Sequence, residues 1–294
     1  YIVSQPQRAP KKQRVAAIDI GTNSTNLLIA DANGNDIVRE VHVTGLGRGV
    51  VNTNTLNDEA IERTVSRLRH YADLIQQHNV EALRVTATEA CRRATNANIF
   101  LDQAESVLGT RPAIIAGTEE GRLAYSGALS HLPPHDGITL VIDIGGGSTE
   151  MIIGQEFEPE LLNSKQMGCV SFTEQYFKNG KLSGKNFNKA MLAAEQKLES
   201  IASAYRKKGW DIALGSSGTI KAIQEVLVGL GFEDGLITAK RLDTLIETLC
   251  NFDSIEEIEL TGLTEERKPV FAAGVAILSA IFKALRIEQM FFSD

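Results

Sequence analysis

The chain has 294 residues, of which 43% are hydrophobic, and a formal net charge of −7 at pH 7. This length supplies cores for two ordinary domains, and the negative charge argues against a general nucleic-acid coat. No apolar run reaches the length needed to span a bilayer and no signal-peptide pattern opens the chain, so we expect a protein without an integral membrane segment.

The first half begins with a basic arm at residues 5–14, to which we assign no function. Residues 16–29, AAIDIGTNSTNLLI, then predict a strand, a tight glycine turn and a second strand, because apolar β-branched residues flank the turn. After TGLGRGV, an amphipathic helix is expected over about 58–77. A short strand, ALRVTAT, leads into EACRRA and a helix over 96–108. The strand RPAIIA then leads into GTEEGRLAY at 117–125, which predicts a turn entering a helix.

The second half repeats this order. Residues 141–154, VIDIGGGSTEMIIG, predict a second glycine-turn hairpin. A helix over about 186–208, the strand DIALG and the turn SSGTI entering another helix follow. The last helix, 269–285, is apolar all round, so we expect it to be buried. Because hairpins followed by strand–helix alternation occur twice, we predict a duplicated α/β unit whose two matched turns face each other across a cleft.

The two turns offer hydrogen-bond donors. A turn free of side chains presents its backbone N–H groups as an anion cradle, and hydroxyl groups add further donors. The candidate residues are Gly21, Thr22, Asn23 and Ser24 in the first turn, and Gly145, Gly146, Gly147, Ser148 and Thr149 in the second. Two facing cradles suit successive phosphate groups, whereas the alternative is a pair of plain tight hairpins.

Acidic residues accompany both turns. Asp19, Asp143 and Glu150 would repel a bare polyphosphate, but they make physical sense if Mg²⁺ lies between them and the phosphates. The sequence therefore predicts a magnesium site in the cleft.

Other polar motifs remain ambiguous from the residues alone. The turn GSSGT at 215–219 either binds phosphate at a helix N-terminus or simply caps that helix. Glu119 and Glu120 either favour the helix dipole or include a group that orients an attacking water. Arg92 and Arg93 are either surface charges or include a group that neutralises a transferred phosphoryl group.

Charge is unevenly distributed along the second half. Residues 165–208 hold nine Lys/Arg against three Asp/Glu, and residues 232–266 hold ten Asp/Glu against two Lys/Arg. These segments are either solvated faces or, for the basic one, a track ending at Arg206–Lys208 that guides a polyanion to the cleft. The three cysteines, Cys91, Cys169 and Cys250, fit no disulfide or metal spacing, so we expect a reducing, cytoplasmic location.

Taken together, DIGTNS, TEACRRA, GTEEGRL, DIGGGSTE and GSSGT resemble, in this order, the exopolyphosphatase / guanosine pentaphosphate phosphatase family. That family belongs to the actin, sugar-kinase and heat-shock-chaperone superfamily. The resemblance covers about residues 14–294, and EExRL followed by DIGGGSTE separates these phosphatases from kinases and chaperones. It implies two ribonuclease-H-like domains, 14–126 and 127–294, with the glycine-turn hairpins facing an interdomain cleft.

The same resemblance implies roles for single residues. Glu120 corresponds to the catalytic carboxylate that handles the attacking water, Arg92 to the arginine on the phosphate under attack, and Asp143 and Glu150 to the magnesium-binding pair. The implied phosphate contacts are Thr22, Asn23, Ser24, Gly145, Gly146, Gly147 and Ser148, with Gly218 and Thr219 extending the site.

The function implied is processive, Mg²⁺-dependent hydrolysis of terminal phosphates from inorganic polyphosphate. The alternative is hydrolysis of guanosine pentaphosphate to the tetraphosphate; a related kinase or ATPase, or an inactive nucleotide sensor, are more distant alternatives. No nucleic-acid partner is expected, and a homodimer is a further hypothesis. Members of the family continue after the terminal Ser-Asp with GALREG, and longer members add a helical HD-type domain, so we expect the chain to be truncated at Asp294.

Overall fold

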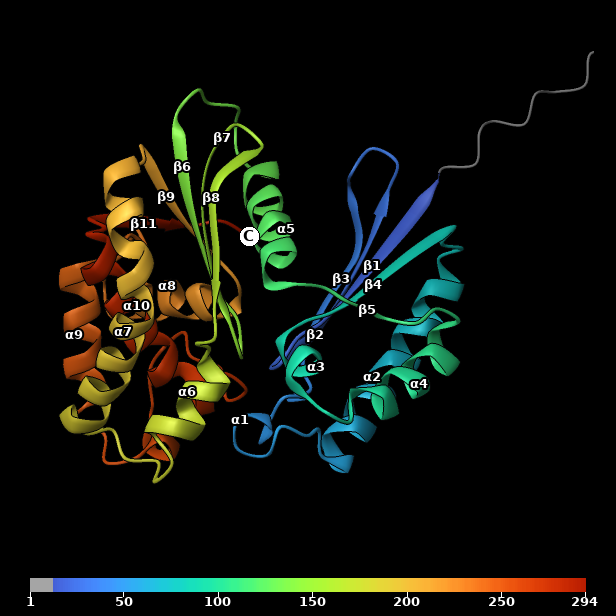
Figure 1. Ribbon diagram of the computed structural model, residues 1–294, viewed down its shortest axis with the longest axis horizontal. Coiled ribbons are helices and arrows are strands. Elements are labelled where there is room, and N and C mark those ends of the chain that lie inside the picture. The colour runs from blue at the N-terminus through green and yellow to red at the C-terminus, as the bar shows by residue number, and fades with distance from the viewer. Residues whose placement is uncertain (1–12) are drawn as a thin grey trace, which may run out of the picture.

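The computed structural model of the chain describes residues 13–294, which form two α/β units side by side (Figure 1). Nearly all of the predicted basic arm therefore lies outside the described residues. Arg14 already belongs to the first strand, and its Nη1 donates to the carbonyl of His78 at 3.0 Å.

The first unit is built on a five-stranded sheet of order β3-β2-β1-β4-β5. Its strands are β1 (Arg14–Ile20), β2 (Ser24–Asp31), β3 (Asp36–Val43), β4 (Ala82–Ala87) and β5 (Ala113–Ile114). Its helices are α1 (Val50–Thr53), α2 (Asp58–Gln77), α3 (Glu89–Arg93) and α4 (Ala97–Leu108). The predicted helix 58–77 is confirmed, and it begins after Asn57 because the Asn57 side chain accepts a hydrogen bond from the Ala60 N–H.

The second unit is built on a six-stranded sheet of order β10-β11-β9-β6-β7-β8. Its strands are β6 (Ile138–Ile144), β7 (Thr149–Gln155), β8 (Glu158–Lys165), β9 (Ile212–Ser216), β10 (Ile237–Thr238) and β11 (Gln289–Phe292). Its helices are α6 (Cys169–Tyr176), α7 (Gly184–Lys208), α8 (Gly218–Gly229), α9 (Ala239–Leu249), the short 3₁₀ helix η1 (Ile255–Glu257) and α10 (Lys268–Leu285).

The duplication predicted from the two hairpins is confirmed by the strand order. The run β8-β7-β6-β9-β11 repeats β3-β2-β1-β4-β5. The hairpins β1–β2 and β6–β7 are antiparallel, and β4 and β9 pair parallel with β1 and β6. This shared order is consistent with two ribonuclease-H-like units. The turn of each hairpin lies at the same end of its sheet, which is the end that faces the other unit.

Helix α5 (Gly117–Ser130) follows the first sheet in the chain but packs on the second. Tyr125, Ala128 and Leu129 are buried with Val141, Ile152 and Leu214 of strands β6, β7 and β9. Gly117 and Gly121 permit this approach, since a Cβ on Gly117 would lie 2.2 Å from Ser164 Oγ and one on Gly121 would lie 3.1 Å from Leu162. On this packing we place the boundary between the two units before Gly117 rather than at residue 126.

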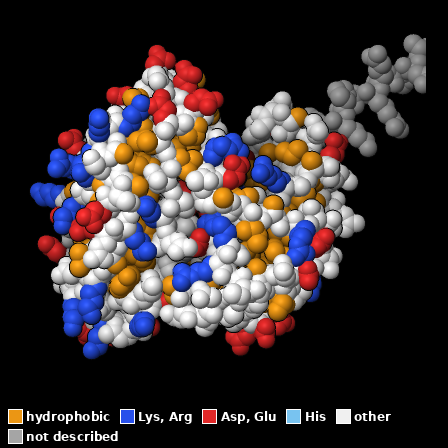
Figure 2. Space-filling view, in the orientation of Figure 1, with side chains coloured by type: hydrophobic (Ala, Val, Ile, Leu, Met, Phe, Trp, Pro, Cys, Tyr) orange, Lys and Arg blue, Asp and Glu red, His pale blue; other side chains and the backbone are white. Residues whose placement is uncertain are grey.

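No helix supplies the same cover to the equivalent face of the first sheet within the described residues. Val15 and Val41 on that face are 42% and 52% exposed, and apolar side chains are visible over this half in Figure 2.

Helix α10 lies at the centre of the second unit, as its all-round apolar sequence predicted. Fourteen of its residues are buried, and it contacts α6, α7, α8 and α9. Contrary to the expectation that no apolar run is long enough, α10 has the length and composition of a membrane span, but 72% of it is buried inside the protein. A core helix of a large domain passes the same test, because both environments select apolar residues on every side.

Candidate active site

The two glycine turns close in the same way and touch each other. Gly21 N–H donates to Ser24 O at 2.9 Å, and Gly145 N–H donates to Ser148 O at 2.9 Å. A Cβ added to Gly146 would lie 2.8 Å from Thr22 Cβ and 2.9 Å from Asn23 N. The second turn therefore needs glycine for contact with the first turn, in addition to any ligand. Across the same boundary, Glu174 Oε1 accepts from Gly49 N–H at 2.7 Å.

A cavity of about 180 Å³ lies between the turns. Its lining includes Thr22, Asn23, Ser24, Glu120, Asp143, Gly145, Gly146, Gly147, Ser148, Gly218 and Thr219. Arg92 and Glu150 stand directly behind this lining, because Arg92 contacts Glu120 and Glu150 lies opposite Asp143 in the hairpin. The structure thus brings all the predicted site residues together around one cavity.

Buried polar atoms without a hydrogen-bond partner concentrate at this cavity. Two are donors suited to phosphate oxygens, Thr22 Oγ1 and Asn23 Nδ2. Three are acceptors, Asn26 Oδ1, Glu89 Oε1 and Glu150 Oε2. Unpaired buried polar groups are costly, so a cluster of them indicates a site that a ligand completes.

The carboxylates occupy equivalent places in the two units. Asp19 lies opposite Asn26 across the first hairpin, as Asp143 lies opposite Glu150 across the second. Glu150 is fully buried, and its Oε1 accepts from Ser164 Oγ at 2.8 Å.

The pKa values of these acids are raised. Burial, and then repulsion by Asp19, raise the pKa of Asp143 to about 6. Burial, and then repulsion by Asp143, raise the pKa of Glu120 to about 7, although Arg92 opposes the shift. Burial, with repulsion by Glu120 and Asp143, raises the pKa of Glu150 well above its ordinary value. Protein surrounding Asp19 also raises its pKa, although its side chain stays open to water in the cleft.

This arrangement fits a hydrated divalent cation. Within residues 13–294, no three His, Cys, Asp or Glu side chains converge closely enough to hold an ion by themselves. Mg²⁺ commonly keeps several waters and binds through one or two carboxylates plus substrate phosphates. The unpaired oxygen of Glu150 and the mutual repulsion of the acids both suit such an ion.

The structure separates the two pairs that the sequence left open. Arg92 and Glu120 are both 19% exposed at the cleft, and Glu120 Oε2 accepts from Arg92 Nη1 and Nη2 at 3.1 Å. Glu119 instead pairs with Arg122 at 2.7 Å, where that arginine is half exposed. Arg93 points toward α1, and its Nε donates to Asn54 Oδ1 at 3.0 Å.

Sequence reasoning assigned no individual role to several residues that line the cavity, among them Asn26, Glu89, Ser217 and Arg267. Asn26 could have been found from its place opposite Asp19, and Glu89 and Ser217 lie inside the motifs TEACRRA and GSSGT, whereas Arg267 carries no local pattern. Ser217 has φ 90° and ψ 161°, a backbone conformation that favours glycine, and its hydroxyl donates to Ile144 O at 2.9 Å. Arg267 forms no salt bridge within the described part of the chain, and a Cβ on Gly218 would lie 1.9 Å from its Nη2.

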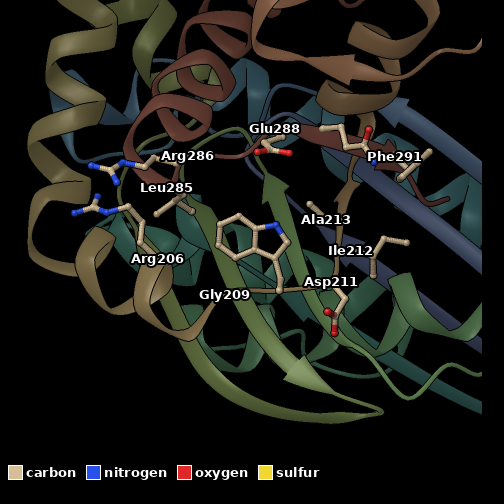
Figure 3. Close-up of a pocket in the computed structure, with 11 residues that line it drawn as sticks. Arg206, Gly209, Asp211, Ile212, Ala213, Leu285, Arg286, Glu288 and Phe291 are labelled. Carbon is tan, nitrogen blue, oxygen red and sulfur yellow. The ribbon is translucent and has the colours of Figure 1, made fainter.

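A larger cavity of about 470 Å³ lies elsewhere, around Trp210 (Figure 3). It borders the start of β9 and the ends of α7 and α10, whereas the active-site cavity lies at the other end of β9. In this view the side chains of Arg206 and Arg286 lie on the same side of the cavity. The prediction that Arg206–Lys208 guides a polyanion to the cleft is therefore wrong in its geometry: Arg206 donates to Ala284 O at 2.6 Å, and Lys208 pairs with Glu160.

Comparisons with known proteins agree with this fold and site. A sequence model of the family described as "Ppx/GppA phosphatase family" matches residues 29–294. The chain is 41% identical to a "Putative exopolyphosphatase" of Haemophilus influenzae, over 99% of this chain and 91% of that protein. It is 40% identical to a "Guanosine-5'-triphosphate,3'-diphosphate pyrophosphatase" of Pseudoalteromonas translucida, over 97% of this chain but only 57% of that protein. The crystal structure of the Aquifex aeolicus member of the Ppx/GppA family superposes with a TM-score of 0.76 at 29% identity, covering 96% and 94% of the two chains.

Proposed function

Since this chain belongs to the Ppx/GppA phosphatase family, whose members hydrolyse phosphoanhydride bonds, we propose that it is a Mg²⁺-dependent exopolyphosphatase that processively removes terminal phosphates from inorganic polyphosphate. The observation that carries the proposal is the cavity between the two turns, where unpaired donors and unpaired carboxylate oxygens meet. Donors bind the phosphate oxygens, and carboxylates bind the accompanying cation.

Glu120 is the group that orients the attacking water and accepts its proton. Its pKa of about 7 suits a general base near neutral pH, because such a base is most effective when its pKa lies near the working pH. The water oxygen forms a bond to the terminal phosphorus while the bond from that phosphorus to the bridging oxygen breaks. The shortened polyphosphate leaves with the electron pair of that bridging oxygen.

Positioning and charge neutralisation carry most of the catalysis in such a reaction. Thr22, Asn23 and the backbone of Gly145–Gly147 hold the phosphate oxygens, and the Arg92 guanidinium faces the phosphoryl group under attack. Asp19, Asp143 and Glu150 would hold Mg²⁺, which when bound neutralises charge on the phosphate chain.

The extent of the similarity favours polyphosphate as the substrate. The match covers 91% of the relative named for polyphosphate but only 57% of the relative named for the nucleotide. The cavity of about 180 Å³ has room for the terminal phosphates of either substrate, and the rest of each would lie outside it. We further propose a cytoplasmic location, supported by three free cysteines, while the homodimer stays a prediction.

Guanosine pentaphosphate hydrolysis is the second candidate. It is favoured by the similar identity, 40%, to a relative that is named for this reaction. Both substrates end in the same phosphoanhydride, so the chemistry of Glu120 and Arg92 serves either. Family membership leaves the kinase alternative without support.

The deciding experiment measures orthophosphate release from long-chain polyphosphate and from guanosine pentaphosphate, side by side at saturating Mg²⁺. We expect a higher kcat/KM for polyphosphate, with chains shortened one at a time to completion. A higher kcat/KM for the nucleotide would assign the second candidate, and no release from either would refute both.

A further inference from the structure

Glu89 contacts the far side of the Arg92 guanidinium. Its Oε2 accepts from Arg92 Nε at 3.1 Å and from Nη2 at 2.9 Å. Glu89 is 7% exposed and sits three residues before Arg92 on α3, so both ends of this pair belong to one short helix. Its other oxygen, Oε1, is buried without a partner at the wall of the active-site cavity.

All the donors of Arg92 are in use. Nη1 donates to Ile115 O at 2.7 Å and to Glu120 Oε2 at 3.1 Å. Nη2 donates to Glu89 Oε2 at 2.9 Å and Glu120 Oε2 at 3.1 Å, with a longer contact of 3.5 Å to Ser148 Oγ. A guanidinium has five N–H donors in a fixed plane. Arg92 can therefore bind a phosphoryl group only by releasing one of these acceptors.

Glu120 is the acceptor that the geometry allows to be released. It lies on α5, which packs on the second sheet, whereas Glu89 and Ile115 precede that helix and belong with the first sheet. Both carboxylates line the cavity, but Glu89 is held three residues from Arg92 on the same helix, whereas Glu120 reaches Arg92 from a helix that packs on the other unit. The two terminal nitrogens that face Glu120 then form the edge that binds oxygens of a phosphoryl group in pairs.

We propose that Glu89 is a positioning residue that fixes the plane of the Arg92 guanidinium. It does so while the Nη1 and Nη2 groups of Arg92 exchange Glu120 for the phosphoryl group as their acceptor. The inference rests on the proposed function only in that Arg92 meets the phosphate. Glu89 acts on catalysis through the guanidinium that its Oε2 anchors, while its Oε1 lies at the wall of the cavity.

The test is a double-mutant cycle of Glu89→Gln and Arg92→Ala, with kcat and KM for orthophosphate release from polyphosphate and thermal unfolding as readouts. Glu89→Gln should lower kcat roughly 10- to 100-fold, since small misplacements near the reacting atoms have effects of this size. KM and the unfolding midpoint should barely change. In the Arg92→Ala background the same substitution should have almost no further effect. Glu105→Gln, which loses a pair with Arg111 on the exposed face of α4, is the matched control.

The proposal is wrong if the losses in kcat caused by the two substitutions multiply in the double variant, or if Glu89→Gln is fully active. Either result would leave the proposed function intact. If the wild type releases no phosphate, the same cycle is measured on the affinity for inorganic phosphate in calorimetry. We expect the effect of Glu89→Gln on phosphate affinity to disappear in the Arg92→Ala background. Additive changes in the binding free energy would refute the positioning role.

Discussion

Arg92 of the first unit and Glu120 of α5 form an ion pair across the cleft, with Glu120 Oε2 3.1 Å from both terminal nitrogens of the arginine. The pair links the two units at the place where the glycine turns meet. Because Arg92 opposes the pKa rise of Glu120, release of the pair by an incoming phosphate makes Glu120 a stronger base. Substrate binding and activation of the base are thereby coupled.

Replacing Glu120 with glutamine should abolish turnover while leaving substrate binding nearly intact. The variant keeps the shape but loses the group that accepts the proton, a loss of roughly 10²–10⁴-fold in kcat. Orthophosphate release measures kcat, and calorimetry with an unhydrolysed analogue measures binding. Glu119→Gln, which breaks the pairs with Arg122 and Arg84 outside the cavity, should behave as wild type. A Glu120→Gln variant with more than about a tenth of the wild-type rate would exclude the base role.

Asp143→Asn should raise the Mg²⁺ concentration needed for half-maximal activity. A hard cation prefers charged oxygen ligands, so the amide binds it more weakly. Titration of activity with Mg²⁺ checks this, with the exposed Asp136→Asn as control. An unchanged Mg²⁺ requirement would remove Asp143 from the metal site.

Without Mg²⁺, ionisation of the buried acids should lower the stability of the folded protein as pH rises. A carboxyl group with a raised folded pKa favours the folded state when protonated, so its penalty grows as pH rises from its ordinary pKa to its folded pKa. For Asp143 that window runs from 3.8 to about 6, and for Glu120 from 4.5 to about 7. Glu150→Gln removes one of these like charges, so its unfolding midpoint should exceed that of wild type by more at about pH 8 than at about pH 5.

Added Mg²⁺ should raise the wild-type midpoint at the higher pH more than that of Glu150→Gln, because the ion offsets the same repulsion. A midpoint difference that does not vary with pH would show that these acids are not ionising inside the folded protein.

Gly168→Ala should destabilise the protein and misplace the second turn. A Cβ at this position would lie 2.3 Å from the backbone carbonyl of Gly146 and 2.4 Å from Gly147 N, where no flexible side chain can yield. Overpacking of this kind costs about 1–3 kcal/mol. Chemical unfolding gives the change, and Gly184→Ala is the control, since its Cβ would meet nothing within 4 Å. Equal stability of the two variants would contradict the close contact.

Arg267→Ala should raise KM for polyphosphate with little change in kcat, because Arg267 lines the cavity beside Gly218 but stands apart from Arg92 and Glu120. Reversing Arg206, Lys207 and Lys208 to Glu should leave KM unchanged for both substrates, since these residues lie at the far end of β9. Initial rates at low salt measure both, because screening weakens such effects at high salt. A larger KM change from the reversed triplet than from Arg267→Ala would restore the basic track.

The sequence by itself determined the duplicated fold and most of the site. Elements with a pattern in consecutive residues were predicted correctly. These are the two hairpins with glycine turns, the amphipathic helix at 58–77 and the helix at 269–285, which is apolar on all sides. The turn residues and their carboxylates share one short motif each. Their positions at one cleft follow because a repeated unit brings the same turn to the same end of each sheet.

Tertiary structure decided what no local pattern encodes. Helix α5 leaves its own sheet and packs on the other, which carries Glu120 to the cleft and leaves Glu119 at the surface. Glu89, Arg267 and the strained Ser217 come to the cavity from three separate segments. The basic end of α7 was assigned from its charge alone, but charge composition does not say which end of a strand a helix terminus meets. Strand β9 settles that, because it begins at Ile212 beside the end of α7 and ends at Ser216 beside the active-site cavity, so the basic end of α7 and Ser217 lie at opposite ends of the strand.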